Sequence, residues 1–135
     1  MNSLRKLTTP TTQIIRSFHA AYPRFTGKTV EANTKTFDEL VRKADHPVIV
    51  DFYADWCGPC RVLTPLLSKT VAANPQVTLV KLNVDDCPEI ASEFKVAALP
   101  TVSAFYEGKV VDTFVGAQPA KVASFIKKHA ELAEK

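Results

Sequence analysis

The sequence has few cysteines, no long apolar run and, in its first thirty residues, no acidic side chain. Three cysteines among 135 residues are too few for a secreted scaffold held together by disulfides, and an odd number leaves one unpaired. No apolar run approaches the roughly 18 residues that a membrane-spanning helix needs. We therefore expect neither a cystine-rich secreted domain nor a membrane span.

Charge is divided unevenly along the chain. The first thirty residues carry five basic and no acidic side chains, whereas residues 31–135 carry 12 basic and 14 acidic ones. The isoelectric point near 8.8 therefore reflects the N-terminal segment and does not indicate a nucleic-acid-binding domain. A content of 46% hydrophobic and 23% charged residues fits one globular domain with a sizeable core.

The N-terminal segment has the composition of an organelle transit peptide. It contains eight Ser or Thr residues and spaced basic residues, and it has no uninterrupted apolar stretch of the kind found in secretory signals. The stretch from Arg16 to Ala21 resembles a mitochondrial processing site. We expect residues 1–24 to be a mitochondrial transit peptide that is cut between Ser17 and Arg24, which leaves residues 29–135 as a domain in the matrix. The alternative is a basic tail that is never removed.

The rest of the chain alternates between strand and helix patterns. The run from Pro47 to Ala54 is continuously apolar apart from Asp51, which predicts a central strand buried on both faces. Further strands are expected at 77–84, 101–106 and 110–115, with a turn at 107–109. Helices are expected over 37–44, from 58 to 71, over 88–94 and from Pro119 onward. The pattern predicts an α/β domain, a mixed sheet with helices on both faces.

Cys57-Gly58-Pro59-Cys60 lies where the central strand is expected to turn into a helix. Free N–H groups at that helix start would face the sulfur of Cys57 and stabilise its thiolate. Two intervening residues allow the cysteines to form a disulfide, and Pro59 suits the first turn of a helix. The motif therefore predicts thiol–disulfide exchange, in which Cys57 attacks a disulfide and Cys60 resolves the mixed disulfide.

Two other interpretations of the cysteine pair are open. It could be half of a zinc site that recruits Cys87 and His46, although a second Cys-x-x-Cys or His-x-x-His is missing. It could also be two inert core cysteines. The third cysteine, Cys87, has no partner in the sequence, and we expect either a tolerated thiol or a regulatory one, with Asp85 and Asp86 blunting its reactivity.

The segment from Val50 to Arg61 is similar to the active-site segment of the thioredoxin family, and the resemblance extends roughly from Val30 to Leu132. It implies the thioredoxin fold, with about five strands and four helices. It also implies protein-disulfide reduction, with electrons supplied by NADPH through thioredoxin reductase and with no bound cofactor or metal. The implied partners are that reductase, peroxiredoxins and other disulfide proteins. We expect a monomer.

The resemblance also assigns roles to individual residues. Asp51 would be a buried acid of raised pKa that helps to deprotonate Cys60, and Lys81 would approach it from the neighbouring strand. Leu99 and Pro100 would form a cis-proline loop against the disulfide, with the Leu99 backbone free to pair with substrate. A flat apolar surface around Cys57 would admit an extended substrate chain. This surface comprises Trp56, Gly58, Pro59, Leu99, Val115, Gly116 and Ala117.

Two functions compete with a reductant. A disulfide oxidase or isomerase would use the same fold, but Gly-Pro between the cysteines favours the reductant, because oxidising relatives usually carry His there. A redox-independent binding module would hold its partner through the apolar surface alone, and a Cys57→Ser variant that kept full activity would support it.

Overall fold

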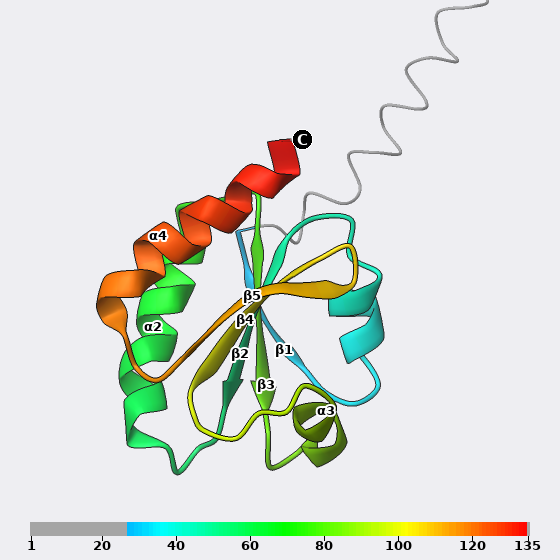
Figure 1. Cartoon of the computed structure of the whole chain (residues 1–135), viewed down its shortest axis with the longest axis vertical. Helices are drawn as coiled ribbons and strands as arrows, with labels where there is room; N and C mark the ends of the chain where they lie inside the picture. The colour runs from blue at the N-terminus through cyan, green and yellow to red at the C-terminus, as the bar shows by residue number, and fades with distance from the viewer. Residues whose placement is uncertain (1–26, 135) are drawn as a thin grey trace, which may run out of the picture.

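The computed structural model describes residues 27–134, so the expected transit peptide at 1–24 and its cleavage site lie outside the described residues. A five-stranded sheet in the order β1-β3-β2-β4-β5 forms the centre of the molecule (Figure 1). The strands are β1 (Thr29–Ala32), β2 (Val48–Tyr53), β3 (Thr78–Asn83), β4 (Thr101–Tyr106) and β5 (Lys109–Val115).

The sheet is mixed, as the sequence predicts. β3 pairs in parallel with both β1 and β2, whereas β4 runs antiparallel to β2 and β5 runs antiparallel to β4. β2 lies at the centre with its first five residues buried, which confirms the prediction drawn from its continuous apolar run. The β4–β5 turn places Glu107 and Gly108 at φ 53° and 80°, the left-handed pair that a two-residue hairpin turn needs.

Helices cover both faces of the sheet (Figure 1). On one face lie α2 (Gly58–Ala72) and α4 (Pro119–Ala130), which a short 3₁₀ turn, η4 (Glu131–Glu134), extends. On the other face lie α3 (Pro88–Glu93) and η3 (Asp38–Arg42). None of the helices within residues 27–134 combines the length and apolarity needed to cross a membrane.

The helix expected over 37–44 is shorter than the sequence pattern suggests. It is a single π-helical turn, in which the Lys43 N–H donates to the Asp38 carbonyl five residues earlier at 2.9 Å. The polar residues before it form a hydrogen-bonded turn, in which Asn33 Oδ1 accepts hydrogen bonds from the N–H groups of Lys35 and Thr36. The N-cap residue of η3 is Phe37, which makes no side-chain capping hydrogen bond. The chain leaves the helical conformation at Lys43, whose φ is −99° and whose ψ is 6°.

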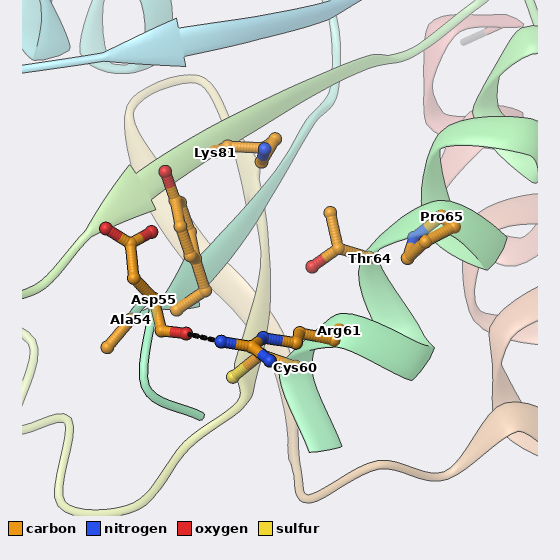
Figure 2. A pocket seen from close by; sticks show the side chains of 8 residues that line it. Ala54, Asp55, Cys60, Arg61, Thr64, Pro65 and Lys81 are labelled. Atoms are coloured by element: carbon orange, nitrogen blue, oxygen red, sulfur yellow. Dashed lines mark hydrogen bonds between the residues drawn. The ribbon is translucent and has the colours of Figure 1, made fainter. Parts of the chain in front are cut away.

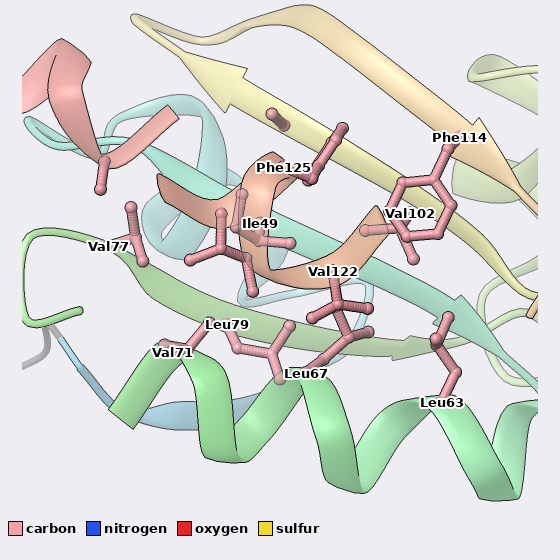
Figure 3. Close-up of a cluster of buried hydrophobic side chains, with 13 residues drawn as sticks. Ile49, Leu63, Leu67, Val71, Val77, Leu79, Val102, Phe114, Val122 and Phe125 are labelled. Carbon is pink, nitrogen blue, oxygen red and sulfur yellow. The ribbon is translucent and has the colours of Figure 1, made fainter. Parts of the chain in front are cut away.

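Alternation along β2 and β3 sends side chains to two separate cores. Ile49 and Leu79 face α2 and α4, where the larger core gathers apolar side chains from helices and sheet (Figure 3). Val50 and Phe52 face α3 and η3 in the second core. Asp51 follows Ile49 by two residues, so the strand places its carboxylate on the same face as the larger core.

Candidate active site

Cys57 and Cys60 lie at the start of α2, as the sequence predicts. Cys57 is the N-cap residue, and its Sγ accepts a hydrogen bond from the backbone N–H of Cys60 at 3.1 Å. The two sulfurs form a disulfide, with Cα atoms 5.3 Å apart. Pro59 occupies the first turn, where its missing N–H leaves no hydrogen bond unmade.

The helix start explains how this pair can exchange electrons. The first N–H groups of α2 have no partner within the helix, and the helix dipole places partial positive charge at this end. A thiolate on Cys57 is stabilised there when the disulfide opens. Both cysteines are buried, with Cys57 4% and Cys60 2% exposed.

Asp51 is a buried acidic residue on the face of β2 that also carries Ile49 of the larger core. It is 0% exposed, and burial raises the pKa of its carboxyl to about 6, an effect that the Thr64 hydrogen bond and the Lys81 charge partly oppose. Its Oδ2 accepts a hydrogen bond from the Thr64 hydroxyl at 2.5 Å, whereas its buried Oδ1 has no hydrogen-bond partner within residues 27–134. A carboxyl with this pKa can take up and release a proton near neutral pH.

Lys81 lies beside Asp51 on β3, in direct register across the β2–β3 pair. Its ammonium, however, lies 3.8 Å from Glu31 Oε1 and 4.8 Å from the centre of the Tyr53 ring. Glu31 Oε2 also accepts a hydrogen bond from the Tyr53 hydroxyl at 2.8 Å. Burial and that carboxylate raise the pKa of the Tyr53 phenol. Lys81 therefore acts on Asp51 through its field and not through a direct ion pair.

A pocket opens over this cluster (Figure 2). Cys60 and Thr64 come from successive turns of α2, and Lys81 lies across from them on β3. Arg61 at its rim donates a hydrogen bond to the Asp55 backbone carbonyl at 2.8 Å. The full lining is Tyr53, Ala54, Asp55, Cys60, Arg61, Thr64, Pro65 and Lys81.

One residue of the expected substrate surface, Leu99, lies next to the disulfide. The Leu99–Pro100 peptide bond is cis, as predicted, and Leu99 packs against the cluster that contains both cysteines. Gly116 N–H donates to the Pro100 carbonyl at 2.8 Å, and Val115 pairs with Thr101 across β4 and β5. The structure thus brings residues 99–100 and 115–116 together, while their role in binding substrate stays a prediction.

The remaining residues of that surface are exposed. Trp56 is 68% exposed, and its indole N–H donates to Asp85 Oδ2 at 2.9 Å. Gly58 and Ala117 are also exposed. A second pocket lies beside Trp56 and is lined by Pro88, Val96, Leu99 and neighbouring residues.

The structure does not assemble the alternative zinc site. Cys87 is 1% exposed and belongs to the second core, whereas His46 contacts Asp45 and Thr78. Within the described part of the chain, no group of three or more His, Cys, Asp or Glu side chains is placed to hold a metal ion.

Sequence reasoning missed two neighbours of Asp51. Thr64 follows Cys60 by four residues, a spacing that puts both on one helix face and could have signalled it. Glu31 reaches the cluster from β1, a four-residue strand with one buried residue that carries no usable apolar pattern.

Comparison with known proteins gives consistent results. The family model described as Thioredoxin matches residues 28–128. A thioredoxin of Streptomyces clavuligerus is 44% identical over 84 residues, which cover 62% of this chain and 78% of that protein. The mitochondrial thioredoxin of Bos taurus is 44% identical over 94 residues, which cover 68% of this chain and 57% of the bovine protein. This chain therefore matches little more than half of the bovine relative.

The fold has close counterparts among solved structures. Mitochondrial thioredoxin 3 of Saccharomyces cerevisiae, crystallised in the oxidised form, superposes with a TM-score of 0.66 at 38% sequence identity. The superposition covers 75% of this chain and 94% of the yeast chain.

Proposed function

The chain belongs to the thioredoxin family, and on that premise we propose that it is a protein-disulfide reductase, an electron-donating dithiol protein. The observation that carries the proposal is the Cys57–Cys60 disulfide at the start of α2. The buried Asp51 carboxyl, whose pKa is raised, supports it, because it hydrogen-bonds Thr64 one helical turn after Cys60. In this proposal the disulfide supplies the nucleophile of one exchange cycle and the buried carboxyl is its proton acceptor.

The cycle begins with the reduced dithiol. The Cys57 thiolate attacks one sulfur of a substrate disulfide, which forms a mixed disulfide and releases the other substrate sulfur as a thiolate that takes up a proton. Cys60 then loses its proton and attacks Cys57 Sγ. The Cys57–substrate bond breaks, its electron pair leaves with the substrate sulfur, and the Cys57–Cys60 disulfide forms. Two electrons have passed from the protein to the substrate.

Asp51 is the group we assign to receive the Cys60 proton. A carboxyl that titrates near 6 can accept a proton at the pH at which the exchange runs and can release it afterwards. The exposed surface of Trp56, Val115 and the neighbouring glycines suits an extended substrate backbone without specific side-chain recognition.

Thioredoxin reductase, using NADPH, restores the dithiol in this proposal, and peroxiredoxins and other disulfide proteins consume it. The dithiol itself is the redox centre, with no bound cofactor. The acid-free, Ser/Thr-rich segment 1–24 supports import into the mitochondrial matrix, and similarity to mitochondrial thioredoxins of other organisms agrees with this location. Microscopy of the full chain fused ahead of a fluorescent protein tests it, and a diffuse cytosolic signal would contradict it.

The activity is tested by insulin-disulfide reduction with NADPH and a thioredoxin reductase, followed as NADPH consumption. We expect turnover with the full chain and only background consumption with Cys57→Ser. Cys87→Ala is the matched control, because Cys87 is buried in the second core and its loss should leave the rate unchanged. A wild-type chain that gives only background consumption would overturn the proposal and favour a redox-independent binding module, whereas a Cys57→Ser variant with the wild-type rate would overturn the role of Cys57 as the nucleophile.

A further inference from the structure

The carboxyl of Asp51 has no surface of its own from which to exchange a proton. Asp51 is 0% exposed, and it is absent from the lining of the pocket that contains Cys60. Its side chain has one hydrogen-bond partner among the described residues, the hydroxyl of Thr64. Any group that links Asp51 to the pocket must therefore both line the pocket and contact the carboxylate.

Thr64 meets both conditions. It lines the pocket together with Cys60, one helical turn away on the same face of α2 (Figure 2), and its Oγ1 donates to Asp51 Oδ2 at 2.5 Å. The pocket has a volume of about 260 Å³, which exceeds the roughly 30 Å³ that one water molecule takes up in the liquid. Solvent can therefore stand between the Cys60 sulfur and the Thr64 hydroxyl.

We propose that Thr64 is the positioning residue of the proton path, through whose hydroxyl the Asp51 carboxylate exchanges its proton with the Cys60 pocket. The inference rests on the proposed reductase function. A hydroxyl suits the task because it donates one hydrogen bond and accepts others at the same time.

The proton moves in three transfers while the mixed disulfide is present. The Cys60 thiol gives its proton to pocket solvent, which passes a proton to Thr64 Oγ1, and the proton already on that hydroxyl moves to Asp51 Oδ2. The Cys60 thiolate then attacks Cys57 Sγ, and the substrate sulfur leaves with the electron pair of the broken bond. Return of the proton by the reverse path restores the Asp51 carboxylate.

The hydrogen bond also fixes the carboxyl group. With Oδ2 held by Thr64, the unpartnered Oδ1 stays in the apolar interior. Removal of the hydroxyl would leave the buried carboxylate with no hydrogen-bond donor among the described residues, which disfavours its charged form. A Thr64 variant without a hydroxyl should therefore change both the rate of proton exchange and the titration of Asp51.

The test compares the full chain with Thr64→Val, Thr64→Ser and Thr70→Val. Valine keeps the shape of threonine without the hydroxyl, and serine restores the hydroxyl. Thr70 is a matched control on the same helix, equally half-buried, whose hydroxyl donates instead to the Leu66 carbonyl at 2.8 Å.

Two measurements are made on each protein. In the first, the reduced protein reacts with an aromatic disulfide whose thiolate is coloured, and stopped-flow absorbance follows release of the second thiolate from Cys57 by Cys60. In the second, carbon NMR follows the Asp51 carboxyl during a pH titration. Neither measurement needs the reductase or a natural substrate.

We expect Thr64→Val to slow the second release at neutral pH by about tenfold or more and to move the Asp51 midpoint upward by roughly one pH unit. Thr64→Ser should restore both quantities, and Thr70→Val should change neither. A Thr64→Val protein with the wild-type rate and midpoint, or a Thr64→Ser protein as slow as Thr64→Val, would overturn the proposed role of Thr64 and leave the reductase function standing. A wild-type chain that never releases the second thiolate would overturn the reductase function and the Thr64 proposal with it.

Discussion

The layer between the sheet and helices α2 and α4 has two very different ends. At one end, Ile49 of β2 and Leu67 and Val71 of α2 are fully buried among apolar neighbours. At the other end, the same strand and the same helix contribute Asp51, Thr64 and Cys60. Two residues along β2 and one turn along α2 separate an ordinary apolar core from the site that we propose exchanges protons.

This contrast shows that the active site is built from core positions. Asp51 follows the alternation that buries Ile49, so the fold places a carboxyl where an apolar side chain would stabilise it more. A second partly buried carboxylate, that of Asp112, is instead stabilised in its charged form by cationic neighbours. Asp112 of β5 lies 3.3 Å from Lys128 Nζ and 3.2 Å from His129 Nε2, and these neighbours lower its pKa despite its partial burial.

The largest effect on stability should come from the apolar end. Leu67→Ala removes a fully buried side chain and should lower the free energy of unfolding by about 2 to 5 kcal/mol, because the helix and sheet cannot close the cavity. Chemical denaturation with the single Trp56 as fluorescent probe measures it. In the folded variant, the pH midpoint of the Asp51 carboxyl should stay at its wild-type value. A loss below about 1 kcal/mol would show that this end is not a close-packed core.

At the other end, Asp51→Asn should stabilise the protein in a pH-dependent way. The folded pKa of about 6 exceeds the ordinary 3.8, so between these values the folded state binds more protons than the unfolded one, and wild-type stability falls as pH rises through this window. Relative to wild type, the variant should gain about 2 to 3 kcal/mol between pH 4 and pH 8.

Denaturation at the two pH values measures this gain, and their difference cancels any change in packing caused by the amide. Asp112→Asn is the control of opposite sign. The lowered pKa of Asp112 contributes stability that is present above its ordinary value of 3.8 and is lost as pH falls below it, so this control is measured between pH 4 and lower pH. A gain for Asp51→Asn that is equal at pH 4 and pH 8 would show that Asp51 is not a buried titrating group.

Lys81→Met should act on the same carboxyl from across the pocket. The Lys81 charge lowers the pKa of Asp51, so its removal should raise the Asp51 midpoint by less than about one pH unit. The methionine keeps the apolar stem of the lysine, and Lys69→Met on α2 provides an exposed control. An unchanged midpoint, read by carbon NMR, would mean that Lys81 serves only its contacts with Glu31 and Tyr53.

The smallest effect is expected from Glu31→Gln. The Glu31 charge raises the pKa of Asp51 as the weakest of its four influences, so the midpoint should fall by a few tenths of a pH unit. Glutamine can still accept the Tyr53 hydrogen bond, which isolates the charge from the contact. A rise of the midpoint in the same NMR titration would mean that the Glu31 charge does not disfavour the Asp51 carboxylate.

The sequence indicates the apolar end and the cysteines more fully than it indicates the neighbours of Asp51. The run around Asp51 predicts a central strand because five consecutive buried residues leave a continuous apolar signal. The Cys57–Cys60 spacing likewise predicts its helix start. β1 is too short to leave such a signal, so the position of Glu31 beside Lys81 could not be anticipated.

Thr64 illustrates a second limit. Its helical spacing from Cys60 is visible in the sequence, yet its contact with Asp51 depends on how α2 packs across β2, which is a tertiary relation. Lys81 shows the same dependence, because its strand register opposite Asp51 agrees with expectation while its ammonium contacts Glu31. The spacing of apolar residues in the sequence predicts the strands and helices, whereas the contacts between polar side chains depend on how those strands and helices pack.

The central claim is that the Cys57–Cys60 pair donates electrons, and its reduction potential tests that claim most directly. The reduction potential is measured by equilibrating the full chain in glutathione or dithiothreitol buffers of known ratio. It should be about −270 mV, in the range of a protein that receives electrons from NADPH. A value between about −180 and −120 mV would belong to an isomerase or oxidase and would contradict the proposed direction of electron flow.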